Sequence, residues 1–157
     1  MLEDKVGIRA ARAEDVEWLE PFYEWLMRPY VELTHEWDTT IFRKCFDPEV
    51  SSIIQYDGQD IGFLVVKDRD DGLYLGDLQL KTEFQGKGIG TYLMKQVLIS
   101  EHRGERDIRL RVLKGNPAVN LYRRLGFKVN QELDNAFQLI LSKDSQYTTK
   151  NKPKKPY

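Results

Sequence analysis

The sequence contains one cysteine, two histidines and no long run of apolar residues. A single cysteine, Cys45, cannot form a disulfide within the chain, and we expect it to be a packed thiol. So few histidines, with no cysteine cluster, disfavour a zinc site, and no metal is expected. No stretch approaches the roughly 18 apolar residues of a membrane span, and the first residues lack the layout of a signal peptide. The sequence therefore indicates a cytoplasmic protein with no membrane contact.

The chain is long enough for one hydrophobic core and too short for two ordinary domains. It has 157 residues, of which 41% are hydrophobic and 31% are charged. Residues 1–142 are predicted to form one domain and carry a net charge of −5, whereas residues 143–157 carry +4 and are predicted to be a flexible basic tail. A tail of four or five lysines is more often a solvated terminus than a nucleic-acid contact, so a nucleic-acid partner is not expected.

Apolar periodicity predicts a mixed α+β domain. A strand is expected first, and then a helix with its apolar stripe from Val16 to Leu26, which Pro21 should kink or split. A second helix follows through Phe42–Phe46. Asp57-Gly58 is a strong hairpin signal. Strands are predicted at Val6–Ala10, Ser52–Tyr56, Ile61–Lys67, from Leu73 onward, Ile108–Leu113, Phe127–Glu132 and Ala136–Leu141.

The strand that starts at Leu73 has an irregular apolar pattern. Leu73 and Leu75 share one parity, whereas Leu78 and Leu80 share the other, so a regular strand could not bury both pairs on one face. A one-residue bulge near Gly76-Asp77 would reconcile the two pairs. A strand buried on both faces, with no bulge, is the alternative.

A glycine-rich turn joins this strand to the next amphipathic helix. It consists of Gln85, Gly86, Lys87, Gly88, Ile89, Gly90 and Thr91. The spacing fits neither a P-loop, because Gly88 follows Gly86-Lys87 where a hydroxyl is needed, nor a dinucleotide fingerprint, because Leu93 replaces the third glycine. Glycines without Cβ atoms leave the backbone amides open, and the helix N-terminus favours negative oxygens. We therefore expect this turn to bind a phosphate-bearing ligand.

This turn and a second segment together resemble the GCN5-related N-acetyltransferase (GNAT) family. Gln85-Gly86-Lys87-Gly88-Ile89-Gly90 is similar to the family's pyrophosphate loop, and Asn116-Pro117-Ala118 through Tyr122 to Gly126-Phe127 is similar to its second signature, with the alanine one position early. The resemblance implies acetyl-coenzyme A as cosubstrate. It also implies one domain with a mixed, mostly antiparallel sheet of about six to seven strands and about four flanking helices. In that fold the strand from Leu73 splays away from Ile108–Leu113.

The resemblance also implies roles for individual residues. Backbone groups of Leu78, Gln79 and Leu80 and the turn Gln85–Thr91 would hold the coenzyme, together with Asn116 and Asn120. Tyr122 would be the general acid that protonates the leaving thiolate, and its alternative role is that of a core aromatic residue.

The general base and the acceptor amine are less well defined by the sequence. Glu36 and Asp77 are weak candidates for the base. Residues 13–38 contain eight acids against one arginine and all three tryptophans, which suits a cationic amine. The alternative is that several of the glutamates form only the solvent-facing side of a helix. Trp18 and Trp25 are assigned to packing, and Trp37, in a polar loop, is the better candidate for the acceptor pocket.

Three functions from different classes fit these observations. The leading one is an N-acetyltransferase that acts on a primary amine of a small molecule or peptide. The second is a coenzyme A-binding sensor without turnover, and the third is an interaction protein that uses the basic tail. The identity of the acceptor, the length of the acyl chain and the oligomeric state stay open; a homodimer is compatible with the family, although no sequence feature shows an interface.

Overall fold

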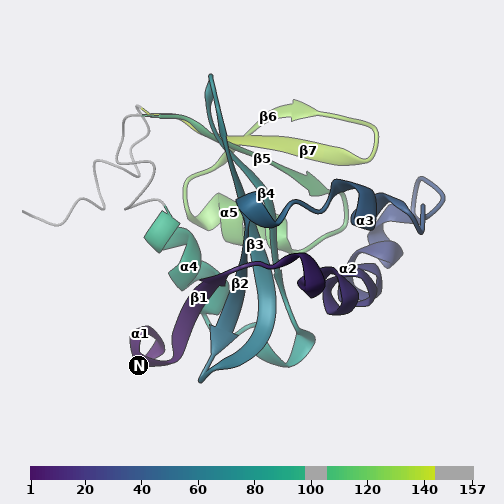
Figure 1. Cartoon of the computed structure of the whole chain (residues 1–157). Helices are drawn as coiled ribbons and strands as arrows, with labels where there is room; N and C mark the ends of the chain where they lie inside the picture. Colours follow the sequence, from purple (N-terminus) through teal and green to yellow (C-terminus); the bar gives the residue numbers. More distant parts are fainter. Residues whose placement is uncertain (98–105, 144–157) are drawn as a thin grey trace, which may run out of the picture.

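The computed structural model describes residues 1–97 and 106–143. Figure 1 shows its helices, 3-10 turns and strands in their order along the chain. The elements are α1 (Leu2–Lys5), β1 (Val6–Ala10), η1 (Ala13–Asp15), α2 (Val16–Val31), α3 (Ile41–Cys45), η2 (Pro48–Val50), β2 (Ser51–Tyr56), β3 (Gln59–Arg69), β4 (Gly72–Leu80), η3 (Thr82–Phe84), α4 (Ile89–Val97), β5 (Ile108–Leu113), α5 (Ala118–Arg124), β6 (Lys128–Glu132) and β7 (Ala136–Leu141).

The strands form one seven-stranded sheet in the order β1-β2-β3-β4-β5-β7-β6. All neighbouring pairs are antiparallel except β4 and β5, which run parallel because α4 crosses over between them. This confirms the predicted mixed, mostly antiparallel sheet of a single domain.

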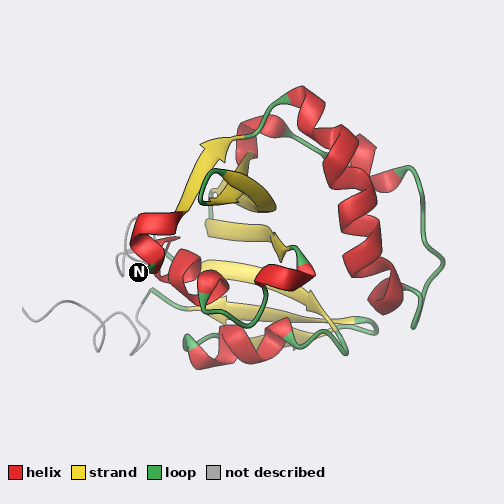
Figure 2. Cartoon of the chain, turned by 90° about the horizontal axis from the view of Figure 1, so that it is seen from below, coloured by secondary structure: helices red, strands yellow, loops and turns green. Residues whose placement is uncertain are grey.

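Figure 2 shows helices on both faces of the sheet. Side chains of successive strand residues pack into the two layers in turn. Ile54 and Leu64 belong to the larger apolar cluster, which includes residues of α4 and α5. Their neighbours Ile53 and Phe63 belong to the smaller cluster, against which side chains of α2 and α3 pack. Since successive strand residues point to opposite faces, the apolar runs of β2 and β3 are explained by helices on both sides.

Two sequence predictions about backbone geometry are confirmed. Asp57 and Gly58 both have positive φ, at 49° and 80°, as a two-residue hairpin between β2 and β3 requires. The register between β3 and β4 shifts between Val65, which faces Asp77, and Val66, which faces Leu75, so Gly76 is the extra residue. The bulge lets Leu75 and Leu80 bury in the same cluster despite their opposite parity.

Other predictions need correction. The helix α2 continues through Pro21 and Pro29, so it is not split at Pro21. Its inward residues pack on the sheet, and this tertiary burial outweighs the backbone bond that each proline removes. A kink at Pro21, the other predicted outcome, stays a prediction. Cys45 is exposed at the end of α3 and is not a packed thiol.

The part of the chain that the structure describes has no helix long and apolar enough to cross a membrane. The predicted basic tail, residues 143–157, lies outside the described residues except for Lys143, and the domain boundary at residue 142 stays a prediction.

A buried ion-pair network fixes the start of α2 against the sheet. Asp15 is only 5% exposed, and both of its oxygens accept bonds from the Arg9 guanidinium at 2.8 and 2.9 Å. The Arg12 amide and the Trp18 indole nitrogen also donate to Asp15, and Arg9 reaches on to Asp60 of β3. The hydrogen bond from Arg9, together with the other donors, holds the pKa of Asp15 well below its usual range. The network therefore stabilises the fold only while Asp15 is ionised.

Replacing Asp15 should destabilise the protein strongly, because the Arg9 charge would lose a buried partner. For Asp15→Ala we expect the free energy of unfolding in urea at pH 7 to fall by about 3–5 kcal/mol. This difference in the free energy of unfolding should shrink as the pH falls below the ordinary pKa of aspartate, about 3.9, because the ion pair of the wild type then weakens as well. Asp4→Ala, at an exposed residue, is the control and should change little; equal effects of the two substitutions would contradict the role of the network.

Candidate active site

A cleft opens where β4 and β5 stop pairing. The two strands are paired only from Leu73 with Ile108 to Leu75 with Leu110, although both continue further. Beyond that point the later residues of β4 and of β5 line the two sides of a cleft of about 1150 Å³. The splayed strand pair implied by the sequence is confirmed, and the cleft begins beside the bulge at Gly76.

The glycine turn forms one end of the cleft. Gly86 and Gly88 have φ of +71° and +83°, a conformation that favours glycine, and both line the cleft. Among the described residues, no group accepts a hydrogen bond from the amides of residues 86–91. Gln85 supports the turn, because its Nε2 donates to the Leu80 carbonyl at 2.9 Å. These free amides and the N-terminus of α4 point to an anionic ligand.

On the other side of the cleft, α5 positions Tyr122. Just before this helix the Asn116 side-chain oxygen accepts a bond from the Ala118 amide at 2.9 Å, which fixes the side chain, and its Nδ2 group can still donate to a ligand. Tyr122 is 6% exposed and packs edge-on against Phe127 at 5.8 Å between ring centroids. No described residue bonds its hydroxyl. Burial and the nearby Asp77 carboxylate raise the pKa of Tyr122, so the hydroxyl stays protonated.

Asp77 is the one carboxylate among the described residues that line the cleft. It directly follows the bulge, and it accepts a single bond, from Gln79 Nε2 at 3.3 Å. Burial raises the pKa of Asp77 to about 7. Burial and Asp77 also raise the pKa of Tyr23, whose hydroxyl has no bonding partner among the described residues. An acid–base group poised near neutral pH thus lies close enough to two protonated tyrosines to raise the pKa of each.

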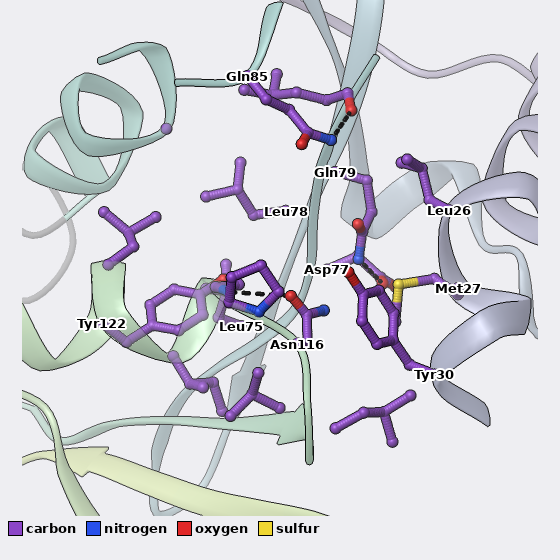
Figure 3. Close-up of a pocket in the computed structure, with 18 of the residues that line it drawn as sticks. Leu26, Met27, Tyr30, Leu75, Asp77, Leu78, Gln79, Gln85, Asn116 and Tyr122 are labelled. Carbon is purple, nitrogen blue, oxygen red and sulfur yellow. Dashed lines mark hydrogen bonds between the residues drawn. The ribbon is translucent and has the colours of Figure 1, made fainter. Parts of the chain in front are cut away.

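The helix α2 forms the far wall of the cleft. Figure 3 shows Leu26, Met27 and Tyr30 on the side of Asp77 and Gln79 that faces away from Tyr122. Tyr23, Trp25 and Val31 also line this wall, so its surface is apolar and aromatic. The sequence-based assignment of Trp25 to packing is wrong, because Trp25 is 77% exposed. Trp25 is seven residues after Trp18, a spacing that puts both on one helix face, so the sequence did not indicate that their burial would differ.

The structure brings most of the predicted site residues together. Those that line the cleft are Asp77, Leu78, Gln79, Leu80, Gln85, Gly86, Gly88, Gly90, Thr91, Asn116 and Tyr122. Lys87 and Ile89 belong to the turn, but the Lys87 ammonium lies over Phe84 and the Ile89 side chain is buried in the core.

Besides Lys87 and Ile89, three further predicted residues do not line the cleft. Asn120 and Glu36 are exposed, and the half-buried Trp37 packs against Tyr23 at 6.0 Å between ring centroids. Two arginines that sequence reasoning did not name, Arg111 and Arg124, do line it. The described residues contain no group of histidine, cysteine or carboxylate side chains that could hold a metal.

Comparison with known families agrees with this geometry. The family model for the acetyltransferase (GNAT) domain matches residues 47–129, which is more than half of the chain. The chain belongs to the GNAT acetyltransferase family. The match spans β2 to α5, and it therefore includes the glycine turn and Tyr122 of this GNAT protein but not α2. A comparison with curated protein sequences gave no significant match.

Solved structures similar to this GNAT protein share its fold over nearly their whole length. The PaiA N-acetyltransferase from Thermoplasma acidophilum, solved in complex with coenzyme A, is 23% identical, with a TM-score of 0.68 over 87% of this chain and 98% of that one. An Arabidopsis thaliana protein, solved with the bisubstrate analogue CoA-Ac-MVNAL, is 18% identical, with a TM-score of 0.59 over 88% and 99%. An acetyltransferase from Thermus thermophilus is 15% identical, with a TM-score of 0.69 over 87% and 96%.

The raised pKa of Asp77 predicts a pH-dependent cost to stability. Because the folded state holds this proton more tightly than the unfolded chain, stability should fall as the pH rises from about 4 to 7. Asp77 is half-buried, so solvent in the cleft screens part of this cost. Asp77→Asn removes the charge, and we expect it to raise the free energy of unfolding at pH 8 by less than about 4 kcal/mol, which the full shift would give, and to have little effect near pH 4. Thermal and urea unfolding measure this difference.

The matched control is Asp70→Asn at an exposed position, which should be neutral at both pH values. If Asp77→Asn is equally neutral at pH 8, the carboxylate is not desolvated in the folded protein.

Proposed function

We propose that this protein transfers the acetyl group of acetyl-coenzyme A to a primary amine. The observation that carries the proposal is the continuity of one cleft, which runs from the free amides of the glycine turn, past Tyr122, to Asp77. The turn supplies a site for the diphosphate, the gap between β4 and β5 suits the pantetheine arm, and Asp77 lies where an amine would arrive. Membership of the GNAT family, and neighbours of the same fold solved with coenzyme A or a coenzyme A conjugate, support this assignment.

The chemistry joins the amine nitrogen to the acetyl carbon and breaks the carbon–sulfur bond. The thiol of coenzyme A has an ordinary pKa of about 8.5, and a leaving thiolate is stabilised by a hydrogen-bond donor. Tyr122 suits this task because its hydroxyl is protonated and has no other partner among the described residues. Full proton transfer from Tyr122 costs more than the roughly 2 kcal/mol that an unshifted tyrosine would require. Its hydroxyl therefore bonds the sulfur first and gives up the proton as the bond breaks.

The amine must lose a proton before or during its attack, and we assign this proton to Asp77. With a pKa of about 7, Asp77 is largely ionised slightly above neutral pH and still a useful base. Glu36, the other candidate from the sequence, is exposed and does not line the cleft. The activity should accordingly rise with pH through about 7, and Asp77→Asn should remove this rise.

Removing the Tyr122 hydroxyl should slow turnover without weakening coenzyme binding. For Tyr122→Phe we expect kcat to fall by about 10²- to 10⁴-fold, because the leaving sulfur loses its donor. Release of free coenzyme A thiol, measured over a panel of primary amines, follows the rate, and calorimetry with coenzyme A follows binding. Tyr56→Phe is the control, since Tyr56 packs on Phe84 outside the cleft lining, and it should retain full activity. Unchanged turnover in Tyr122→Phe would remove Tyr122 as the acid.

Adding one methyl group to the glycine turn should weaken coenzyme binding. In Gly88→Ala the φ of +83°, which side-chain-bearing residues rarely adopt, would strain the turn and displace the free amides, so we expect the Kd of coenzyme A to rise by about tenfold or more, or about 1.4 kcal/mol. Calorimetry measures this change. Gly58→Ala has the same backbone strain, with φ of +80° and open space around the new atom, but it lies in the β2–β3 hairpin. Equal affinities of the two variants would contradict a diphosphate site at this turn.

A further inference from the structure

The acceptor side of the cleft is apolar, whereas the nearby acids face elsewhere. The residues of α2 that line the cleft carry no charge, and they include Leu26, Met27, Tyr30 and Val31. The exposed Trp25 adds an open indole surface at the same wall. This wall lies outside residues 47–129, so it belongs to the part of the chain that the family model does not describe.

The glutamates of α2 are paired on surfaces other than the cleft. Arg28 bonds Glu24 at 3.0 Å and Glu32 at 2.9 Å, and Arg43 of α3 bonds Glu17 and Glu20. None of these four carboxylates lines the cleft. Indeed none of the eight acids of residues 13–38, which suggested a cationic acceptor, lines the cleft. Glu24 and Glu32 line a smaller neighbouring pocket, where Arg28 pairs with both.

The charge that remains in the cleft suits one ammonium group only. Asp77 is the single carboxylate among the described lining residues, whereas Arg111 and Arg124 line the cleft with positive charge. Arg111 is also close enough to Tyr23, on the acceptor wall, to affect its titration. A second ammonium on the acceptor would meet an arginine and an apolar wall instead of a carboxylate, and its desolvation would be uncompensated.

We propose that the acceptor is a monoamine whose amino group lies one or two carbons from a large apolar or aromatic group. Its nitrogen would lie at Asp77, and its apolar body would bury against Leu26, Met27 and Tyr30. This inference rests on the proposed acetyl transfer and deepens it. A free aralkylamine, an aromatic amino acid and a peptide that begins with an apolar residue all carry this chemistry.

The test compares acceptors by kcat/KM, from release of coenzyme A thiol by the full chain. The apolar arms are 2-phenylethylamine, phenylalanine and a short peptide that begins with phenylalanine, and they distinguish the three sources of the amine. The polycationic arm is spermidine. We expect the best apolar arm to exceed spermidine by on the order of 10-fold or more, as burial of a ring against this wall would give.

Matched variants distinguish an effect on acceptor binding at the α2 wall from a general effect on folding. Leu26→Ala should lower kcat/KM for the best apolar amine by about tenfold, whereas Leu33→Ala, at a 67% exposed position outside the cleft lining, should not change it. Tyr30→Glu places a second carboxylate beside Asp77 and should shift the preference toward spermidine, a gain that misfolding cannot produce.

The outcomes are distinct. A preference of the wild type for spermidine, or equal effects of Leu26→Ala and Leu33→Ala, would overturn the apolar acceptor while acetyl transfer stands. Binding of coenzyme A without turnover of any amine would overturn acetyl transfer itself, and the acceptor class with it.

Discussion

The end of pairing between β4 and β5 is the constraint on which the proposed site depends. Parallel strands need a crossover, and here α4 supplies it, so the glycine turn must lie at the end of β4. The extra residue at Gly76 shifts the register of β4 against β3 just where β5 separates. The bulge at Gly76 therefore coincides with the opening of the cleft. It places Asp77 in the cleft lining and allows Leu80 to be buried in the core. The fold keeps its stability because β4 stays paired with β3 and the first halves of β4 and β5 still meet.

The two walls of the cleft have different origins. The wall made by β4, the glycine turn and α5 lies within residues 47–129, which match the GNAT family. The opposite wall is α2, held in place by the buried pair of Arg9 and Asp15 and by aromatic packing of Tyr23 on Phe42 and Phe63. We infer that the first wall binds the coenzyme and the second selects the acceptor. One domain can then combine coenzyme binding that is shared with the family and an acceptor preference that is specific to this chain.

Sequence reasoning succeeded where the signal is local. The glycine turn, the Asp57-Gly58 hairpin and the parity change between Leu75 and Leu78 each depend on a few neighbouring residues, and the structure has the predicted geometry at all three. It failed where the outcome depends on distant partners. Glu17 and Glu20 of α2 pair with Arg43, more than 20 residues away in the sequence, and the exposure of Trp25 depends on where α2 meets the sheet. The raised pKa of Asp77 likewise results from burial that a strand pattern does not specify.

The central claim is that the gap between β4 and β5 binds coenzyme A with its diphosphate on the amides of residues 86–91. A crystal structure of the protein with coenzyme A tests this most directly. The account predicts diphosphate oxygens within hydrogen-bond distance of those amides, the pantetheine arm between β4 and β5, and the sulfur beside the Tyr122 hydroxyl. Coenzyme A bound elsewhere on the surface, with the amides of the glycine turn free of it, would contradict the account.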